Sequence, residues 1–376
     1  MIKKITFFVI YFALFACQTN KKKESENDAT ATAKTEIKYA KGFSIRHFEN
    51  YTLIVVRNPW DTTQTMEKYV LVDRNKAVPT NLPAGNVVKV PVQRVATCSS
   101  VFAGEYMLLN AIHLIVGVSD PEYVDIPEIK NGLKNGSIAD LGMTTSLDLE
   151  KLLVAKTDIL IVSPFEASMH DRFKKYGVCV VKDASYMEET PLGRAEWIKF
   201  EATFLGKSKL ANKIFSGTEN RYLQLSKQAL AVKNRPTVFT ETKFGDSWYI
   251  AGGKSYMGSF MKDAGANYIF RELKNSGSMP FSFEKVYAAA INADYWLIKY
   301  NDCVMDLTYK RLGEQYELYK NFNAFKRKNV YAVNSGTSAF YEEGPLEPDV
   351  VLADLIKIFH PELLPNYKPK YYIPIN

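Results

Sequence analysis

Short apolar strands alternate with segments of helical period in two separate stretches of the chain. In the first stretch, the strand-like runs RVATCSS, LIVGVSD, DILIVSP and VCVVKD are spaced by helix-like runs such as VFAGEYMLLNAI. In the second, after Pro236, the runs TVFTET, YWLIKY and VYAVN occupy equivalent places. This alternation is typical of parallel sheets flanked by helices. We therefore predict an α/β fold with two Rossmann-like lobes, for which 376 residues provide enough chain.

Two further regions complete the expected organisation. The stretch from Phe43 to Val95 alternates apolar and polar residues in TLIVV, KYVLV and NVVKV, which predicts a β-rich extension. Residues 191–233 have a helical period that is broken near Gly206, which predicts a stiff helical linker. The expected units are an N-terminal lobe with its extension (43–190), the linker (191–233) and a C-terminal lobe (234–376).

The first residues are expected to be a targeting segment and not part of the fold. Lys3 and Lys4 precede an apolar run that ends at Ala16-Cys17, and this run is too short to span a bilayer as a mature helix. A small residue followed by Cys resembles the lipobox of a bacterial lipoprotein, although Phe15 is an unusual residue at its position. The resemblance implies a signal peptide (1–16), lipidation of Cys17, and a lipid-anchored location on the periplasmic or cell-surface side. The alternative is a simple signal peptide with an incidental Cys. The polar, lysine-rich residues 17–42 are predicted to be a disordered tether.

Charge and motifs exclude several functions. The formal net charge is +7, without a basic helix or an RNA-binding signature, so we expect no nucleic-acid partner. Cys98, Cys179 and Cys303 lack CxxC spacing, which favours buried thiols over a disulfide framework or a zinc site. There is no GxSxG motif, and the run before Gly253-Lys254 lacks the first glycine of a phosphate-binding loop. We expect no catalysis and no resident cofactor.

A glutamate occurs twice in the same local setting. The segments SLDLEKLLVAKTDILIV and SFEKVYAAAINADYWLI place Glu150 and Glu284 just after a helix-capping residue, Asp148 or Ser282. One glutamate in a first helical turn only complements the helix dipole. Two glutamates at matching places in two lobes suggest a shared task.

The ordered series of these segments resembles the helical-backbone class of ABC-transporter substrate-binding proteins, which serve iron chelates, haem and cobalamin. The series comprises RVATCSSVFAGEYMLLNAI, LGMTTSLDLEKLLVAKTDILIVS, the linker, GGKSYMGSFMKDAGANYIF and SFEKVYAAAINADYWLI, and it covers roughly residues 87–360. The resemblance implies a monomer that docks Glu150 and Glu284 onto an ABC permease dimer. This sequence departs from the family pattern in its elaborate N-terminal extension, and its second segment has ten residues from Glu to Asp against eight in the first.

Ligands of two-lobed α/β proteins bind beyond the carboxyl ends of the parallel strands. At the ends expected here, hydroxyl groups precede a helix and aromatic side chains lie in predicted loops. Ordinary helix capping and packing within one lobe are the competing interpretations. The candidate ligand-binding residues are Thr97, Ser99, Ser100, Tyr123, Phe165, Trp248, Tyr249 and Tyr341, and Lys243 and Lys254 could offset ligand charge.

The number and spacing of the histidines limit the classes of ligand that we expect. Only four histidines occur, without HxxxH spacing, so a bare metal ion fits less well than a preformed chelate and no protein metal site is expected. An iron chelate, either a siderophore or haem with Tyr341 as a possible axial ligand, is our first hypothesis. A cobalamin or other corrinoid is the second. The rival from another class is a lipid-anchored scaffold or adhesion protein, for which the β-rich extension would be the evidence.

Overall fold

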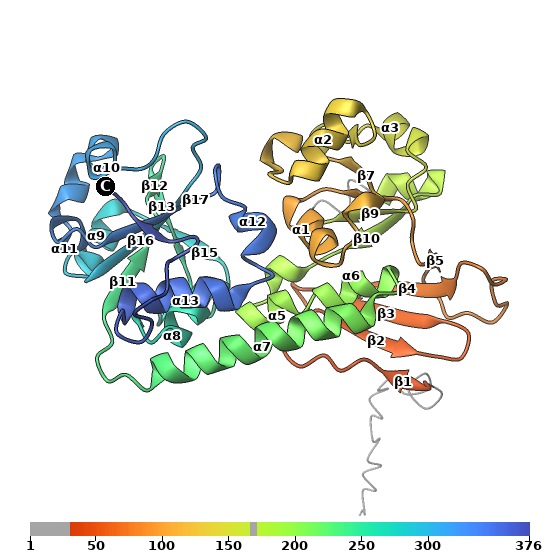
Figure 1. Ribbon diagram of the computed structural model, residues 1–376, viewed down its shortest axis with the longest axis horizontal. Coiled ribbons are helices and arrows are strands. Elements are labelled where there is room, and N and C mark those ends of the chain that lie inside the picture. Colours follow the sequence, from red (N-terminus) through yellow and green to blue (C-terminus); the bar gives the residue numbers. More distant parts are fainter. Residues whose placement is uncertain (1–30, 166–170) are drawn as a thin grey trace, which may run out of the picture.

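The computed structural model describes residues 31–165 and 171–376, and it has two α/β lobes joined by a helical connector (Figure 1). The expected fold class, with its β-rich extension, is confirmed. The expected signal peptide and the lipidation site Cys17 lie outside the described residues. Within the described residues, no helix has the length and apolar character needed to cross a membrane.

The N-terminal lobe is built on an all-parallel sheet of five strands. The most apolar strand, Ile159–Val162, is buried at every position, as expected for a strand with helices on both faces. In spatial order the strands are β10 (Cys179–Lys182), β9 (Ile159–Val162), β6 (Val95–Thr97), β7 (Ile115–Val118) and β8 (Ala139–Asp140), and the helices are α1 (Ser100–Leu108), α2 (Pro127–Asn135) and α3 (Leu149–Val154).

The C-terminal lobe has a second five-stranded sheet, parallel except at its β17–β18 edge, and a small antiparallel sheet. The main sheet follows the order β14 (Asn267–Tyr268), β11 (Thr237–Thr240), β16 (Tyr295–Tyr300), β17 (Val330–Asn334) and β18 (Ile373–Pro374); the small sheet has β12 (Lys243–Phe244), β13 (Ser247–Ala251) and β15 (Ser278–Phe281). The helices are α8 (Tyr256–Asp263), α9 (Phe283–Ala290), α10 (Tyr309–Gln315), α11 (Asn323–Lys326), α12 (Phe340–Glu343) and α13 (Pro348–Phe359).

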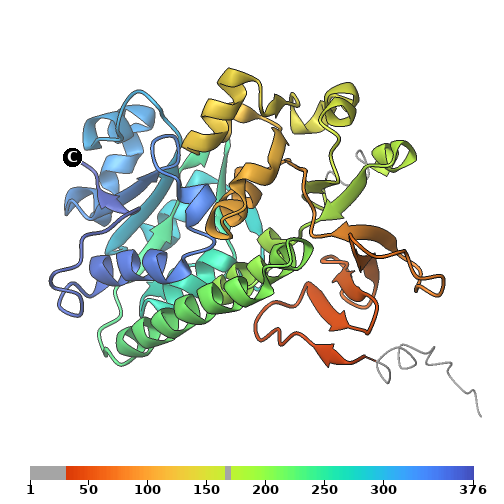
Figure 2. The same cartoon turned by 45° about the vertical axis from the view of Figure 1, so that its right-hand side comes forward.

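The β-rich extension is a five-stranded sheet beside the N-terminal lobe (Figure 2). Its apolar face shares one continuous core with the lobe. Tyr69 of the extension also bonds to the backbone of the lobe, because its hydroxyl donates to the carbonyl of Val180 (3.2 Å) and accepts from the amide of Lys182 (2.8 Å). The strands, in spatial order, are β1 (Ala33–Lys34), β2 (Phe43–His47), β3 (Thr52–Arg57), β4 (Thr65–Asp73) and β5 (Asn86–Val90).

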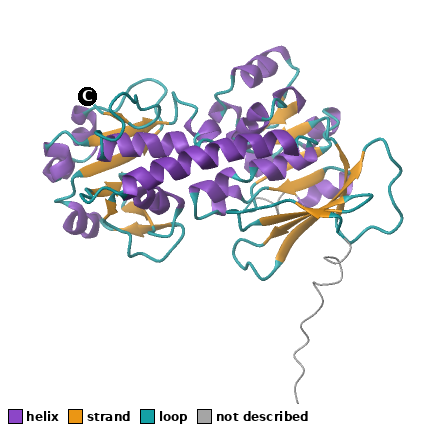
Figure 3. Ribbon diagram, turned by 60° about the horizontal axis from the view of Figure 1, so that its bottom comes forward, coloured by secondary structure: helices purple, strands orange, loops and turns teal. Residues whose placement is uncertain are grey.

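The connector consists of three helices: α5 (Pro191–Ala195), α6 (Ile198–Phe204) and α7 (Ser208–Leu230). The break falls where the sequence indicated it, at Gly206, whose φ of 66° is left-handed and suits glycine. Helix α7 packs against α6 at one end and against α13 of the C-terminal lobe. It therefore lies across both lobes (Figure 3).

The expected tether is wrong at its carboxyl end. Strand β1 pairs with β2, and the amides of residues 38–42 are bonded to carboxylates within or just before the connector. Buried Glu196 accepts the amides of Lys38, Tyr39 and Ala40, and Glu188 accepts the next two amides. The sequence of this segment looks disordered because its partners are more than 140 residues away along the chain.

The repeated segments occupy equivalent places in the two lobes. Asp158, before β9, accepts the amide of Arg94 (3.2 Å), just before β6. Asp294, before β16, accepts the amide of Thr237 (2.9 Å) at the start of β11. Each aspartate thus fixes the beginning of one strand to the beginning of its neighbour, which explains the Asp that ends each copy of the repeat.

The two lobes touch through α1 and α12. A Cβ on Gly104 would lie 1.9 Å from the carbonyl oxygen of Glu342, so only glycine permits this approach. The Glu342 side chain, which is buried, accepts the amide of Asp125 at 3.1 Å. A close backbone approach and one hydrogen bond therefore hold the lobes together at this point.

Candidate functional site

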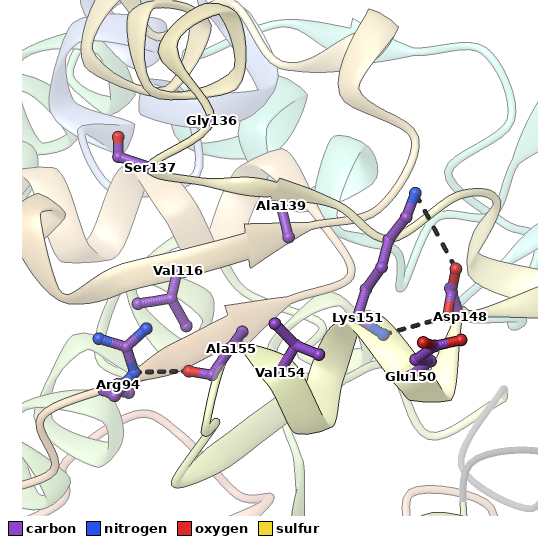
Figure 4. Close-up of a pocket in the computed structure, with 10 residues that line it drawn as sticks. All are labelled: Arg94, Val116, Gly136, Ser137, Ala139, Asp148, Glu150, Lys151, Val154 and Ala155. Atoms are coloured by element: carbon purple, nitrogen blue, oxygen red, sulfur yellow. Dashed lines mark hydrogen bonds and ion pairs between the residues drawn. The ribbon is translucent and has the colours of Figure 1, made fainter.

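Glu150 stands in the first turn of α3 and is exposed. The cap residue Asp148 accepts the amide of Lys151 at 3.1 Å, which fixes the helix start. Beside it a hollow of about 510 Å³ runs between α3 and the sheet, with Glu150 at one end and Arg94 at the other (Figure 4). Val154, 76% exposed, is an apolar neighbour on the same helix. Glu150 is therefore presented on a fixed helix start at an open, partly apolar surface.

Glu284 has the same setting in the other lobe. It is exposed in the first turn of α9, and Ser282 caps the helix by accepting the amide of Lys285 at 3.4 Å. Backbone and Ser282 hydrogen bonds hold the pKa of Glu284 below its usual range, with a smaller contribution from Lys243. It is an anion at neutral pH.

Both glutamates lie toward the carboxyl ends of the parallel strands of their lobes. Helix α3 leads directly into β9, and α9 leads into β16, and each of these strands is parallel to its neighbours. A helix that precedes a parallel strand runs back along the sheet, so its amino end lies near the carboxyl ends of the strands. The two anions are thus exposed at corresponding edges of the two sheets.

A polar cluster lies on the C-terminal lobe where β11 and β16 end. The Lys299 ammonium pairs with Glu241, the residue after β11. Burial alone would lower the pKa of Lys299, but Glu241 and nearby tyrosines raise it, so the lysine stays charged. Burial raises the pKa of Tyr256 to about 12, against the opposing effects of Arg194 and Lys299. The Arg194 guanidinium, on the connector, lies 5.1 Å from the centre of the Tyr256 ring. Arg194 of the connector and Lys299 of the C-terminal lobe therefore both lie close to the Tyr256 phenol.

Three buried carboxylates form a cluster, and two of them, Glu105 and Asp183, interact electrostatically with Arg194. Glu105, Asp183 and Glu201 are at most 1% exposed, and their donor atoms lie within 4.8 Å of one another. Burial raises the pKa of each: that of Asp183 to about 6, and those of the two glutamates well above their usual range. This spacing suits either protons shared between the carboxylates or a bound cation.

Four of the predicted ligand residues lie around the contact between the lobes. Ser99 caps α1 by accepting the amide of Val101 at 3.3 Å, and Ser100 is the first residue of that helix. Tyr341 is on α12 and is 44% exposed. Tyr123 is 64% exposed, two residues before the Asp125 amide that contacts α12. Ser99, Ser100 and Tyr341 thus belong to the two helices that touch, whereas exposed Phe165 follows β9 and exposed Tyr249 lies on β13.

Two predictions for the ligand site are wrong. Trp248 is fully buried on β13, where its ring packs on Phe239 and its Nε1 donates to the Thr240 carbonyl, so it is a core residue. Thr97 is 1% exposed. The expectation of three buried thiols holds for Cys98 but fails for Cys179, which is partly buried, and for Cys303, which is exposed.

Sequence reasoning missed Arg194, Tyr256, Glu241 and Lys299 as site residues. Glu241 and Lys299 follow or end strands, so the rule that ligands bind at carboxyl ends could have found them. Arg194 and Tyr256 come together only through the packing of α5 on α8.

Comparison with known proteins supports this architecture. The profile of a family described as "Periplasmic binding protein" matches residues 112–336. Two uncharacterized lipoproteins of Methanocaldococcus jannaschii are similar: one is 26% identical, covering 90% of this chain and 85% of that one, and the other is 29% identical, covering 82% and 80%.

Solved structures show the same fold at low sequence identity. The TroA-like periplasmic binding protein FepB of Veillonella parvula has a TM-score of 0.58 and 17% identity, covering 77% of this chain and 96% of that one. The periplasmic haem-binding protein HutB of Vibrio cholerae has a TM-score of 0.55 and 17% identity, covering 69% and 98%. A periplasmic haem-binding protein of Pseudomonas aeruginosa has a TM-score of 0.56 and 19% identity, covering 74% and 95%.

Proposed function

Because the chain belongs to the periplasmic binding protein family, we propose that it is the substrate-binding component of an ABC importer. In this role it captures an iron chelate, a siderophore or haem, outside the cytoplasm and delivers it to a membrane permease. Cys17 would carry the lipid anchor, in keeping with the lipoprotein names of its relatives.

The observation that carries the proposal is the pair of exposed, capped glutamates. Glu150 and Glu284 stand at equivalent places in the two lobes, each on the helix before the strand that pairs with the first strand of its main sheet, as a permease dimer with two related contact sites requires. Charge pairs at such a rim govern orientation and association rate.

The polar junction between the lobes supports an anionic chelate. Arg194 supplies positive charge there, Lys299 is held as a cation by Glu241, and Tyr256 supplies a phenol beside them. For haem, the exposed Tyr341 at the lobe contact is the candidate axial ligand.

Charge reversal tests the docking role. The double variant Glu150→Lys/Glu284→Lys should abolish chelate uptake by cells while the purified protein keeps its affinity for the chelate. A matched control is Glu128→Lys, because Glu128 is also exposed in a first helical turn of the same lobe. Uptake that survives the double variant would refute the docking role.

The ligand class is tested by calorimetric titration with haemin, a ferric siderophore and cobalamin. Binding of an iron chelate supports the proposal, whereas binding of cobalamin alone would reassign the substrate. A protein that binds none of them and shows no thermal shift would favour the scaffold hypothesis.

A further inference from the structure

Three aromatic rings from distant parts of the chain form a row. The ring centres of Trp60 and Phe165 are 5.3 Å apart, and those of Phe165 and Tyr186 are 5.1 Å apart. Trp60 belongs to the turn between β3 and β4 of the extension. Phe165 and Tyr186 follow β9 and β10, so they stand at the carboxyl edge of the sheet, where ligands of such lobes bind.

Two rings of the row remain open to solvent. Trp60 is 54% exposed and Phe165 is 62% exposed. These two exposed rings are not needed to attach the extension to the lobe, because the shared core and the Tyr69 hydroxyl already join the two. Exposed aromatic rings held side by side are an apolar surface without a covering partner in the described part of the chain.

The turn that presents Trp60 is held rigid by its own side chains. The Asn58 side chain accepts the amide of Trp60 at 2.9 Å. Asp61 accepts from the amide and hydroxyl of Thr63 and from the Gln64 side chain, at 2.6–3.1 Å. The indole is therefore placed in advance, which lowers the ordering cost of binding.

The same turn borders the space between the lobes. A cavity of about 280 Å³ is lined by Asn58, Pro59 and Thr62 of the turn, by Met187 of the N-terminal lobe and by Ser276 of the C-terminal lobe. Three parts of the molecule therefore meet beside the aromatic row.

We infer that the β3–β4 turn forms one wall of the ligand site, and that Trp60 and Phe165 stack on a planar aromatic group of the ligand. This inference rests on the proposed function and adds to it a subsite for aryl-bearing chelates, which the extension supplies. Offset or tilted stacking between such rings is the arrangement that aromatic groups prefer.

Calorimetry with two kinds of chelate tests the inference. Haemin and iron(III) tris-catecholate carry planar aromatic groups, whereas ferrioxamine B, a ferric hydroxamate, carries none. Trp60→Ala and Phe165→Ala should each lower the affinity for the aromatic probe by about tenfold, as expected for the loss of one stacked ring. Trp60→Phe should restore most of it. The matched control is Phe244→Ala, which removes an 81% exposed ring on β12.

A second readout uses the other tryptophans. Trp197, Trp248 and Trp296 are all fully buried, so iodide should quench the emission of Trp60 alone. The gallium(III) tris-catecholate complex should protect that emission in the wild type, and Trp60→Phe should have no quenchable emission to protect.

The outcomes separate the two proposals. If the wild type binds an aromatic probe and Trp60→Ala binds it equally well, the aromatic subsite is refuted and chelate capture stands. Equal losses for ferrioxamine B and the aromatic probe would also refute the subsite. If the wild type binds no chelate, the proposed function fails, and the subsite fails with it.

Discussion

Replacement of Glu196 by Gln should release the N-terminal segment from the connector. The Glu196 carboxylate is fully buried and accepts the amides of Lys38, Tyr39 and Ala40 at 2.7–3.0 Å. It also pairs at 2.7 Å with the ammonium of Lys199, whose side chain is 8% exposed. Glutamine keeps one acceptor oxygen but turns an NH₂ donor toward these donors and leaves Lys199 without its anion.

The size of the effect follows from these contacts. Removing one partner of a buried ion pair costs about 3–5 kcal/mol, because the other charge stays buried. At 1.4 kcal/mol for each factor of ten, local opening of the segment should become about 10²–10³ times more frequent. Glu189→Gln is the matched control, since Glu189 is 42% exposed and pairs with exposed Lys41, an interaction worth about 0–1 kcal/mol.

Amide hydrogen exchange measures this directly. The amides of Tyr39 and Ala40 should exchange about 10²–10³ times faster in Glu196→Gln than in the wild type, and should be unchanged in Glu189→Gln. If protection of these two amides is the same in both variants, the buried carboxylate does not hold the segment.

Three further changes have definite expected results. Because burial raises the folded-state pKa of Asp183 from 3.8 to about 6, the native chain keeps a proton there that the unfolded chain loses, so stability falls as pH rises from about 4 to about 6; Asp183→Asn should reduce this fall by up to about 3 kcal/mol in urea melts, the remaining slope being due to Glu105 and Glu201, and an unchanged slope would contradict the assignment. Gly104→Ala should cost about 1–3 kcal/mol by overpacking the contact between α1 and α12, which thermal unfolding would show, and an unaltered midpoint would mean that the lobes do not touch there. Cys303 should react quickly with a thiol reagent in the native protein, whereas partly buried Cys179, whose pKa burial raises to about 12, should react much more slowly; equal labelling of wild type and Cys303→Ser would contradict this.

Local pattern was enough to predict the lobes, because each strand and cap depends on neighbours in the sequence. The runs around Glu150 and Glu284 contain their own caps, Asp148 and Ser282, so their helix starts could be recognised. The same reasoning failed for Trp248, which was expected in a loop after Gly245-Asp246. It is instead the turn of a hairpin, whose alternation turns Trp248 inward and Tyr249 outward.

Contacts between distant segments could not be predicted from one sequence. Nothing near Glu196 marks it as the acceptor for residues 38–40, and nothing near Trp60 indicates its contact with Phe165. The Arg194–Tyr256 pair likewise exists only once the connector has packed on the C-terminal lobe. The site was therefore predictable where strand ends define it and unpredictable where separate parts of the chain build it.

The close backbone contact between Gly104 of α1 and Glu342 of α12 limits how this architecture can adapt to different ligands. Main chain meets main chain at Gly104 and Glu342, so no side chain there can be enlarged or trimmed to alter the spacing of the two halves. Adaptation to bulkier or slimmer cargo must then come from segments at the open margins, such as residues 58–64. In a lineage of such proteins, that hairpin tip should vary in length while the glycine stays.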